Sequence, residues 1–503
     1  MSRGAPGPGG TEGQPPVEAA GRDEVSPTLD STSSVAGDRI RGDRAAPDAS
    51  RWRRLHLVGI GGAGMSGVAH LLLARGFDVS GSDIKETREL DHLRKAGARV
   101  SIGHAPQQIG DPDAVVVSSA IPRRNVEVLE ARRRGIPVLL RGEVLVGLMR
   151  GRRGVAVAGT HGKTTTTSMI AVMLSAAGLD PSYVIGADLN ETGSRAFHGG
   201  GEYFVAETDE SDQSFDLYEP EIAVLTNVEE DHLDFYRNRQ EIEAAFAAFV
   251  SRARSVVACW DDPGVRTTLE GVATPRITYG TGPESDLVVR DLRMEDGGSR
   301  ASIDVRGKTI AVQLSVPGRH NLVNAAAALA VASLLDLPLE GAAEALRSFT
   351  GVRRRFEYRG AERGVTFVDD YAHHPTEVKA TLETASWKDH RRVVAVFQPH
   401  RYTRTQAMWR ALGESLGGAD VVVFTDVYGA GESPIPGVTG KLLVEALAEL
   451  CPGKRIVYLP RRWEVARFLA REVRPGDLVL TLGAGDVTMV GEETLERLKE
   501  MAR

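Results

Sequence analysis

Short apolar runs alternate with helical patterns of apolar residues along most of the chain. Many of the runs are followed by glycines or by a polar group, and then by the next helical pattern. This alternation predicts parallel β-sheets with helices on both faces. The runs expected to form strands are residues 55–60, 77–80, 114–117, 136–139, 155–158, 203–206, 222–226, 255–258, 365–368, 393–397, 421–425, 456–459 and 478–481.

Three further runs, residues 286–292, 301–305 and 310–314, follow one another after short turns. That spacing predicts an antiparallel meander added to a parallel sheet. The pattern divides the chain into a tail, residues 1–50, and three α/β domains, residues 51–150, 151–350 and 351–503. The tail has no aromatic residue and is crowded with Gly, Pro, Ser, Asp and Arg, so we expect it to be disordered.

Composition narrows the class of protein. The chain of 503 residues has a formal net charge of −7, whereas general nucleic-acid binders are more often basic. Its two cysteines, Cys259 and Cys451, exclude a disulfide framework and a cysteine-ligated zinc site. We find no apolar run long enough to span a bilayer and no signal peptide at the start. We therefore expect a cytoplasmic protein that neither inserts into a membrane nor binds nucleic acid.

A glycine-rich loop, GIGGAG at residues 59–64, follows the first predicted strand and precedes a helix. Bare backbone would let a pyrophosphate approach the helix N-terminus, where unpaired N–H groups point outward. Asp83 ends the next predicted strand, where a dinucleotide-binding fold places its ribose acid. A tight turn without a ligand gives the same pattern, and the loop cannot choose between NAD and a nucleotide sugar.

A second loop, GTHGKTT at residues 159–165, follows another strand and opens a helix. Backbone amides would hold a β-phosphate, Lys163 would reach the β- and γ-phosphates, and a Thr hydroxyl would meet Mg²⁺. The usual P-loop pattern requires Gly at position 157, where this chain has Val157, and Gly159 lies two residues later. Two phosphate loops on successive α/β units predict two phosphorylated ligands that meet across a domain boundary.

Acidic residues and a histidine end the next two strands. The run Glu207–Asp212 follows one strand, and residues 227–232, which include His232, follow the other. Carboxylates beside an ATP loop are natural Mg²⁺ ligands because Mg²⁺ prefers hard oxygens. A solvated acidic turn and a structural histidine are the simpler alternatives.

The last third of the chain adds cations. Three arginines, 353–355, precede Phe356, and the segments 369–375 and 398–404 each end a predicted strand. Arg401 and Arg404 would suit a carboxylate, which a guanidinium holds with two hydrogen bonds. In open α/β sheets, ligands bind outside such strand ends.

Taken together, these segments resemble the Mur ligases of peptidoglycan synthesis. The resemblance covers the chain from about Leu55 to the C-terminus. It rests on ten motifs in order: GIGGAGMSG, AGTHGKTTT, ESDQSF, TNVEEDHLD, PGRHNLVNAAAA, RRRFE, DDYAHHPTE, FQPHRYTRT, YGAGE and GAGDV.

The resemblance implies three domains: a Rossmann-like N-terminal domain for a UDP-sugar, a central P-loop-type ATPase domain with an added antiparallel sheet, and a Rossmann-like C-terminal domain for an amino acid. The implied reaction joins L-alanine to the lactyl carboxylate of UDP-N-acetylmuramate, with ATP and two Mg²⁺ ions, through an acyl phosphate. A monomer or homodimer is expected.

The resemblance also implies roles for individual residues. The catalytic residues would be Lys163, His232, Arg355 and His373, the last one assisting deprotonation of the amine. ATP would bind to Gly159, Thr160, His161, Gly162, Lys163, Thr164, Thr165, His320, Asn321, Asn324 and Asp370. The UDP-sugar would bind to Gly59, Gly61, Gly62, Ala63, Gly64 and Asp83, and the amino acid to Tyr371, His373, His400, Arg401 and Arg404. The metal ligands would be Thr164, Glu207 and His232.

One departure from several sibling Mur ligases is the absence of a lysine after Asp231-His232. In those siblings this lysine is carbamylated and helps to hold the second metal. No lysine occurs between Lys163 and Lys308. Arginine cannot replace it, because a guanidinium stays protonated and repels Mg²⁺. We expect His232, substrate oxygens and water to hold the second ion.

Three other functions remain open at this stage. An NAD dehydrogenase would use the first glycine loop but leaves the Gly162-Lys163-Thr164 loop unexplained. A non-enzymatic ATP switch would need no muramyl substrate. A sibling ligase that attaches a recycled murein tripeptide shares much of the motif set.

Overall fold

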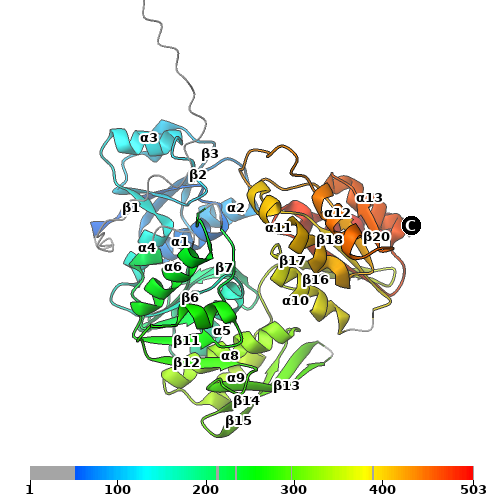
Figure 1. The fold of residues 1–503 in the computed structure, drawn as a ribbon. Coiled ribbons are helices and arrows are strands. Elements are labelled where there is room, and N and C mark those ends of the chain that lie inside the picture. Colours follow the sequence, from blue (N-terminus) through cyan, green and yellow to red (C-terminus); the bar gives the residue numbers. More distant parts are fainter. Residues whose placement is uncertain (1–50, 211–214, 233–234, 296, 388–389, 502–503) are drawn as a thin grey trace, which may run out of the picture. The chain divides into compact units, whose positions relative to one another are not determined.

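The computed structural model describes residues 51–210, 215–232, 235–295, 297–387 and 390–501, and their strands form three sheets (Figure 1). The predicted disorder of residues 1–50 lies outside the described residues, as does part of the acidic run that begins at Glu207. The expected fold class is confirmed, since each sheet is mainly parallel and has helices between its strands.

The first sheet has five parallel strands in the order β3-β2-β1-β4-β5. The order reverses between β1 and β4, which opens a crevice at their carboxyl ends. The elements are β1 (Arg54–Val58), α1 (Ala63–Ala74), β2 (Asp78–Asp83), α2 (Arg88–Lys95), β3 (Arg99–Ile102), β4 (Ala114–Val117), α3 (Val126–Arg133), β5 (Val138–Leu140) and α4 (Arg141–Met149).

The second sheet has ten strands in the order β15-β14-β13-β12-β11-β10-β6-β9-β7-β8. The predicted meander is confirmed, because β13, β14 and β15 pair in antiparallel fashion, while β8 adds an antiparallel edge beside β7. The elements are β6 (Arg153–Ala158), α5 (Lys163–Ala176), β7 (Ser182–Leu189), β8 (Ser194–Phe197), β9 (Tyr203–Glu207), β10 (Ile222–Leu225), α6 (Arg239–Ser251), β11 (Ser255–Cys259), α7 (Pro263–Thr268), β12 (Arg276–Gly280), β13 (Leu287–Glu295), β14 (Gly298–Val305), β15 (Lys308–Leu314), α8 (Arg319–Leu334) and α9 (Leu339–Arg347).

The third sheet has six strands in the order β16-β17-β21-β18-β19-β20, with only the β16 edge antiparallel. Its elements are β16 (Glu357–Glu362), β17 (Val365–Asp370), α10 (Pro375–Ser386), β18 (Arg392–Phe397), α11 (Tyr402–Ser415), β19 (Val421–Phe424), α12 (Lys441–Leu450), β20 (Arg455–Tyr458), α13 (Arg462–Glu472), β21 (Asp477–Leu482) and α14 (Met489–Glu500).

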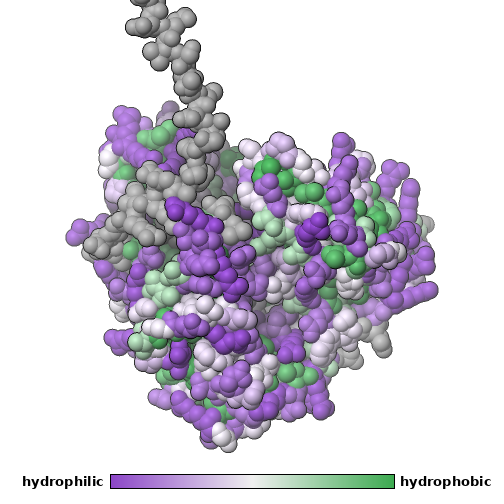
Figure 2. All heavy atoms as spheres, in the orientation of Figure 1, coloured by the Kyte–Doolittle hydropathy of each residue, from purple (hydrophilic) through white to green (hydrophobic). Residues whose placement is uncertain are grey.

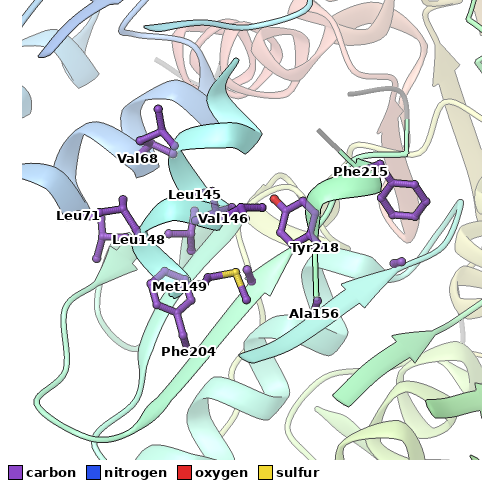
Figure 3. Close-up of a cluster of buried hydrophobic side chains, with 14 of the residues drawn as sticks. Val68, Leu71, Leu145, Val146, Leu148, Met149, Ala156, Phe204, Phe215 and Tyr218 are labelled. Carbon is purple, nitrogen blue, oxygen red and sulfur yellow. The ribbon is translucent and has the colours of Figure 1, made fainter. Parts of the chain in front are cut away.

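A single apolar core joins the first two sheets. Figure 3 shows Val68 and Leu71 of α1, and Leu145 and Leu148 of α4, near Phe204 of β9. All five side chains are buried. Burial of apolar surface stabilises a fold by roughly 25 cal/mol per Å², so this shared core holds the two sheets together as one body.

The six-stranded sheet has apolar cores of its own. The two core clusters around it contain residues from 365–498 only. Hydrophilic residues cover most of the face drawn in Figure 2, with hydrophobic residues in small groups between them. Among the described residues, no helix combines the length and the apolar character needed to cross a membrane.

Candidate active site

The phosphate loop connects β6 to α5 and depends on two glycines. Gly159 has a φ of 134°, and a Cβ there would lie 2.1 Å from the hydroxyl of Thr226. Gly162, the N-cap of α5, has a φ of 78°. Residues with a Cβ rarely adopt such positive φ values, and at position 159 a Cβ would also clash with Thr226. Glycine is therefore required at position 159, although the usual P-loop pattern has its first glycine two residues earlier. The N-terminus of α5 carries no side-chain cap and is suited to an anion.

Lys163 is the first residue of α5, and its ammonium group is paired with Glu210. The Nζ atom donates to the two carboxylate oxygens of Glu210 at 3.0 and 3.1 Å. Burial works against the charge, but Glu210, Glu207 and Asp209 outweigh it and raise the pKa of Lys163. A positive charge therefore stands at the phosphate loop.

Two of the predicted metal ligands are in contact. The hydroxyl of Thr164 donates to Oε2 of Glu207 at 2.9 Å, and the amide of Gly186 donates to the same oxygen at 2.8 Å. His232, the third predicted ligand, lies near Glu210, the carboxylate that pairs with Lys163. Its Nε2 atom is 3.8 Å from Oε1 of Glu210. Hydroxyl and carboxylate oxygens at this edge fit Mg²⁺.

The three consecutive arginines differ in their partners. Arg353 lies 3.6 Å from Asp188, and Arg354 donates to Asp369 at 3.0 Å. Arg355 lies 3.4 Å from Oε1 of Glu377. Burial opposes its charge, but Glu377 and Asp370 outweigh burial and raise the pKa of Arg355. All three arginines line the main cavity.

His373 is a neutral histidine held by its own loop. Its amide donates to Glu377 at 3.0 Å, and Nδ1 lies 2.9 Å from the carbonyl oxygen of Tyr371. Burial lowers the pKa of His373 to about 4. With Nδ1–H donating to the carbonyl, Nε2 is left as a proton acceptor.

The guanidinium group of Arg404 already has a carboxylate partner within the protein. Its guanidinium donates to the buried Asp231 at 2.9, 3.0 and 3.1 Å, and Nη1 lies 3.3 Å from Nδ1 of His400. Burial would raise the pKa of Asp231, but Arg404 and His232 outweigh it and hold that pKa well below its usual range. Arg401 lines a smaller cavity of about 230 Å³, which shares Asp231, His232 and Arg404 with the main one.

The first glycine loop is held by Asp83. The carboxylate accepts from the amide of Gly61 at 2.9 Å, so it supports the turn between β1 and α1. Gly64 lies against Arg141, whose guanidinium is 3.4 Å from Asp209. Through Gly64 and Arg141, this loop reaches the main cavity.

A further cavity of about 590 Å³ begins behind the phosphate loop. Thr165, Asn321 and Arg355 contribute to it. Asn324 approaches Gly162, whereas the carboxylate of Asp370 accepts from the amides of Phe356 and Ala372. Burial raises the pKa of Asp370 to about 6. In this structure Asp370 organises the backbone and lines neither cavity.

The main cavity has a volume of about 670 Å³. It is lined by Gly64 of α1 and Arg141 of α4, which flank the five-stranded sheet, and by residues of the ten-stranded and six-stranded sheets and their loops. The predicted site residues that line it are Gly64, Thr160, His161, Gly162, Lys163, Thr164, Glu207, His232, Arg355, Tyr371, His373 and Arg404. The predicted residues outside that lining are Gly59, Gly61, Gly62, Asp83, Gly159, Thr165, His320, Asn321, Asn324, Asp370, His400 and Arg401; Ala63 begins α1.

The sequence did not indicate the ion pairs of these groups, although Glu210 and Asp231 lie within the predicted segments 207–212 and 227–232. Glu210 and Glu377 hold Lys163 and Arg355, and Asp231 holds Arg404. A signal existed for Glu377, because its side chain accepts from the backbone of His374, the N-cap residue three positions earlier. A Glu at that spacing marks the start of a helix.

Comparison with known proteins agrees with this geometry. The model of the Mur ligase family catalytic domain matches residues 54–153, that of the Mur ligase middle domain matches 157–332, and that of the Mur ligase glutamate ligase domain matches 354–485. The UDP-N-acetylmuramate–L-alanine ligase of Pelotomaculum thermopropionicum is 48% identical over 453 residues, which are 89% of this chain and 98% of that protein. The enzyme of the same name from Acidothermus cellulolyticus is 48% identical over 460 residues, 89% of this chain and 96% of that protein.

Two solved structures of ligases also align with this chain over most of its length. The UDP-N-acetylmuramate–alanine ligase of Thermotoga maritima aligns with a TM-score of 0.77 at 30% identity, over 89% of this chain and 99% of that one. A murein peptide ligase from Psychrobacter arcticus aligns with a TM-score of 0.67 at 26% identity, over 89% and 98% of the two chains. The chain belongs to the Mur ligase family.

Proposed function

We propose that this protein joins L-alanine to the lactyl carboxylate of UDP-N-acetylmuramate in an ATP-dependent reaction. One observation carries the proposal: the phosphate loop with Lys163, Gly64 at the end of the first glycine loop, and Arg355 with His373 line one cavity. The near full-length similarity to enzymes named for this reaction supports the choice of substrates.

The chemistry follows from the weak electrophilicity of a carboxylate. A lactyl carboxylate oxygen takes the γ-phosphoryl group of ATP, which gives an acyl phosphate and ADP. The amine of alanine then attacks the acyl carbon, and inorganic phosphate leaves as the amide forms. Negative charge gathers on the transferred phosphoryl group, so fixed cations provide most of the stabilisation. Lys163 and Arg355 are the cations placed to supply it.

Thr164 and Glu207 would hold one Mg²⁺ ion and His232 a second one. Bound there, Mg²⁺ would neutralise phosphate charge and orient the oxygens that react. The position of Glu210 between Lys163 and His232 adds a carboxylate to this set. With no lysine between positions 163 and 308, we propose that no carbamylated lysine takes part.

Alanine would bind where the two cavities meet. Arg404 borders both, Arg401 borders the smaller one, and the rings of His373 and His400 lie 5.6 Å apart. The neutral Nε2 of His373 is the group we assign to accept a proton from the amine. Asn321 and Thr165, which line the 590 Å³ cavity, would face the adenine side of ATP.

An assay of amino-acid choice tests the proposal. With UDP-N-acetylmuramate and ATP present, L-alanine is expected to give one ADP per amide formed. The tripeptide L-alanyl-γ-D-glutamyl-meso-diaminopimelate is the comparison substrate. A preference for the tripeptide would assign the chain to the murein peptide ligases, and ADP release without muramyl substrate would overturn both assignments.

A further inference from the structure

Two histidines and a glutamate meet beside the phosphate loop, apart from the expected Mg²⁺ ligands. His161 and Glu229 come from the segments that follow β6 and β10, and His374 comes from the N-cap of α10. One potential ligand atom from each residue lies within 4.8 Å of the other two. Nε2 of His161 and Nδ1 of His374 are both 3.7 Å from Oε2 of Glu229. The set therefore joins the ten-stranded and the six-stranded sheets.

Each imidazole is oriented through its other nitrogen. Nδ1 of His161 lies 3.4 Å from Oε1 of Glu377, and Nε2 of His374 lies 3.4 Å from the carbonyl oxygen of Glu230. Metal-binding histidines usually donate their second N–H to a carboxylate or a backbone carbonyl in this way. One nitrogen of each ring is directed at Glu229. Nδ1 of His374 also accepts from the amide of Thr376 at 3.4 Å, and Oε2 of Glu229 accepts from the hydroxyl of Thr376 at 2.6 Å, so a bound ion would replace these two contacts.

The nitrogen of His161 that faces Glu229 has no hydrogen-bond partner. Nε2 is fully buried, and the side chain as a whole is only 10% exposed. A buried polar atom without a partner costs about 1–3 kcal/mol, so its presence calls for an explanation. A ligand bound at Nε2 would provide one.

We propose that His161, Glu229 and His374 bind one Zn²⁺ ion. Two imidazoles and one carboxylate, with water at the fourth position, form a common Zn²⁺ ligand set, whereas Mg²⁺ prefers oxygen. Tetrahedral Zn²⁺ with bonds of about 2.0–2.1 Å places its ligand atoms roughly 3.4 Å apart. The observed 3.7 Å separations need only a small contraction. Since its ligands come from both sheets, the ion holds them together.

Another histidine–glutamate–histidine set serves as a comparison. His56 and His104 lie 3.7 and 3.3 Å from Glu127 in the five-stranded sheet. There the hydroxyl of Ser82 donates to Glu127 at 2.6 Å and lies 2.9 Å from Nδ1 of His104. Unlike His161, Glu229 and His374, these three residues do not form a group whose ligand atoms all lie within 4.8 Å of one another, so we expect no metal at this set.

Equilibrium dialysis of the full chain against Zn²⁺, with Mg²⁺ in excess, tests the site. We expect one tightly bound Zn²⁺ per chain, and at least about tenfold weaker binding in Glu229→Gln and in His374→Asn. Asparagine keeps the helix cap that His374 provides, and thermal melts check that both variants are folded. His104→Asn and His232→Asn are the matched controls and should bind Zn²⁺ like the wild type.

Substitution by Co²⁺ gives a second readout, because tetrahedral Co²⁺ absorbs strongly in the visible range. The wild type should show this absorption, and folded His374→Asn should lose it. Unchanged Zn²⁺ affinity in both Glu229→Gln and His374→Asn would overturn the proposal. So would a loss of the ion in His104→Asn or His232→Asn, since either result places the metal elsewhere.

Discussion

Individual charges in the main cavity are matched in pairs. Lys163 is held by Glu210, Arg355 lies beside Glu377, and Arg404 is held by Asp231. A phosphate or carboxylate of a substrate must therefore compete with a carboxylate of the protein. Specificity at this scale depends on how well each substrate group replaces its protein counterpart.

The substitution Lys163→Ala is expected to lower kcat/KM by more than about 100-fold while the protein stays folded. The reason is the loss of a fixed charge that stabilises the transferred phosphoryl group, at 1.4 kcal/mol per tenfold. Steady-state assays and a thermal melt measure the two effects. Lys379→Ala, which removes a lysine exposed on α10, is the control and should behave like the wild type. Near-normal turnover in folded Lys163→Ala would contradict the role given to this loop.

Arg404→Ala should raise the KM for L-alanine far more than the KM for UDP-N-acetylmuramate. It should also destabilise the fold by about 3–5 kcal/mol, since Asp231 would be left buried without its partner. The double variant Arg404→Ala, Asp231→Asn separates the effects, because it should regain stability but not alanine affinity. Urea unfolding and substrate titrations provide the two measurements. Equal changes in the two KM values would mean that Arg404 serves another purpose.

In the protein without bound Zn²⁺, stability should fall between pH 7 and pH 9.5 because of His161. Burial alone would lower its pKa, but Glu229 and Glu377 outweigh burial and raise the pKa of His161 to about 9, from an ordinary 6.5. The folded state thus binds a proton more tightly than the unfolded state. The resulting stabilisation, at most about 3 kcal/mol, is complete below pH 6.5 and is lost as the pH rises through 9.

Unfolding measured across this range should show a shallower decline in His161→Asn than in the wild type. An identical pH dependence in the two proteins would mean that His161 is not charged in the folded state.

The motifs indicated the lining of the cavity because they follow strand ends, and strand ends share one edge of a parallel sheet. They did not indicate the partners of those residues. Arg404 and Asp231 are 173 positions apart, so no local pattern connects them. Asp83 and Asp370, expected at the UDP-sugar and at ATP, also accept from backbone amides, a role that depends on how the turn closes.

At the level of elements, the connection from β6 to α5 is the most constrained part of the site. Gly159→Ala would place a Cβ 2.1 Å from Thr226 and 3.0 Å from backbone atoms of Asn227. We expect it to weaken ATP binding at least tenfold and to lower stability. Gly178→Ala is the matched control: its φ of 75° is also positive, but no atom lies within 4 Å of the added Cβ. It should cost about 1 kcal/mol and leave ATP binding intact.

Binding of a fluorescent ATP analogue together with thermal melts distinguishes these outcomes. If both variants bind ATP alike, the close approach at Gly159 is not what shapes the loop.

Central parallel strands were predictable because they are buried on both faces and appear as continuous apolar runs. Strands at a sheet edge, or next to one, were harder to recognise. β16 carries Arg359, Gly360 and two glutamates, and β7 is interrupted by Gly186 and Asp188, so neither shows a clear run. Pairing with a neighbouring strand, rather than composition, forms these elements.

At the scale of the whole described chain, the three sheets form two bodies, one with the five-stranded and ten-stranded sheets and one with the six-stranded sheet. Apolar cores stabilise each body internally. One apolar core includes residues from both the five-stranded and the ten-stranded sheets, whereas the six-stranded sheet has its own. Contacts between the two bodies include polar pairs such as Arg404 with Asp231 and Thr376 with Glu229. Interfaces of this polar kind permit relative motion.

Hydrogen exchange can test this division. Phe204→Ala should destabilise its body by about 3–5 kcal/mol and speed exchange in both β1–β5 and β6–β12. Phe397→Ala should speed exchange within the six-stranded sheet alone. Each variant is the control for the other, and uniform acceleration in both would mean that the chain unfolds as a single unit.

The main cavity is lined by residues of both bodies, and we expect this division to protect bound ATP from water. The β6–α5 loop alone offers ATP an anion site and one lysine. Arg355 and His373, which complete the constellation, belong to the other body. When the two bodies stand apart, the γ-phosphate meets too few cations to be cleaved quickly. We expect this division to slow the hydrolysis of ATP in the absence of the other substrates, because the proposed catalytic groups come together only when both bodies bind the same substrates.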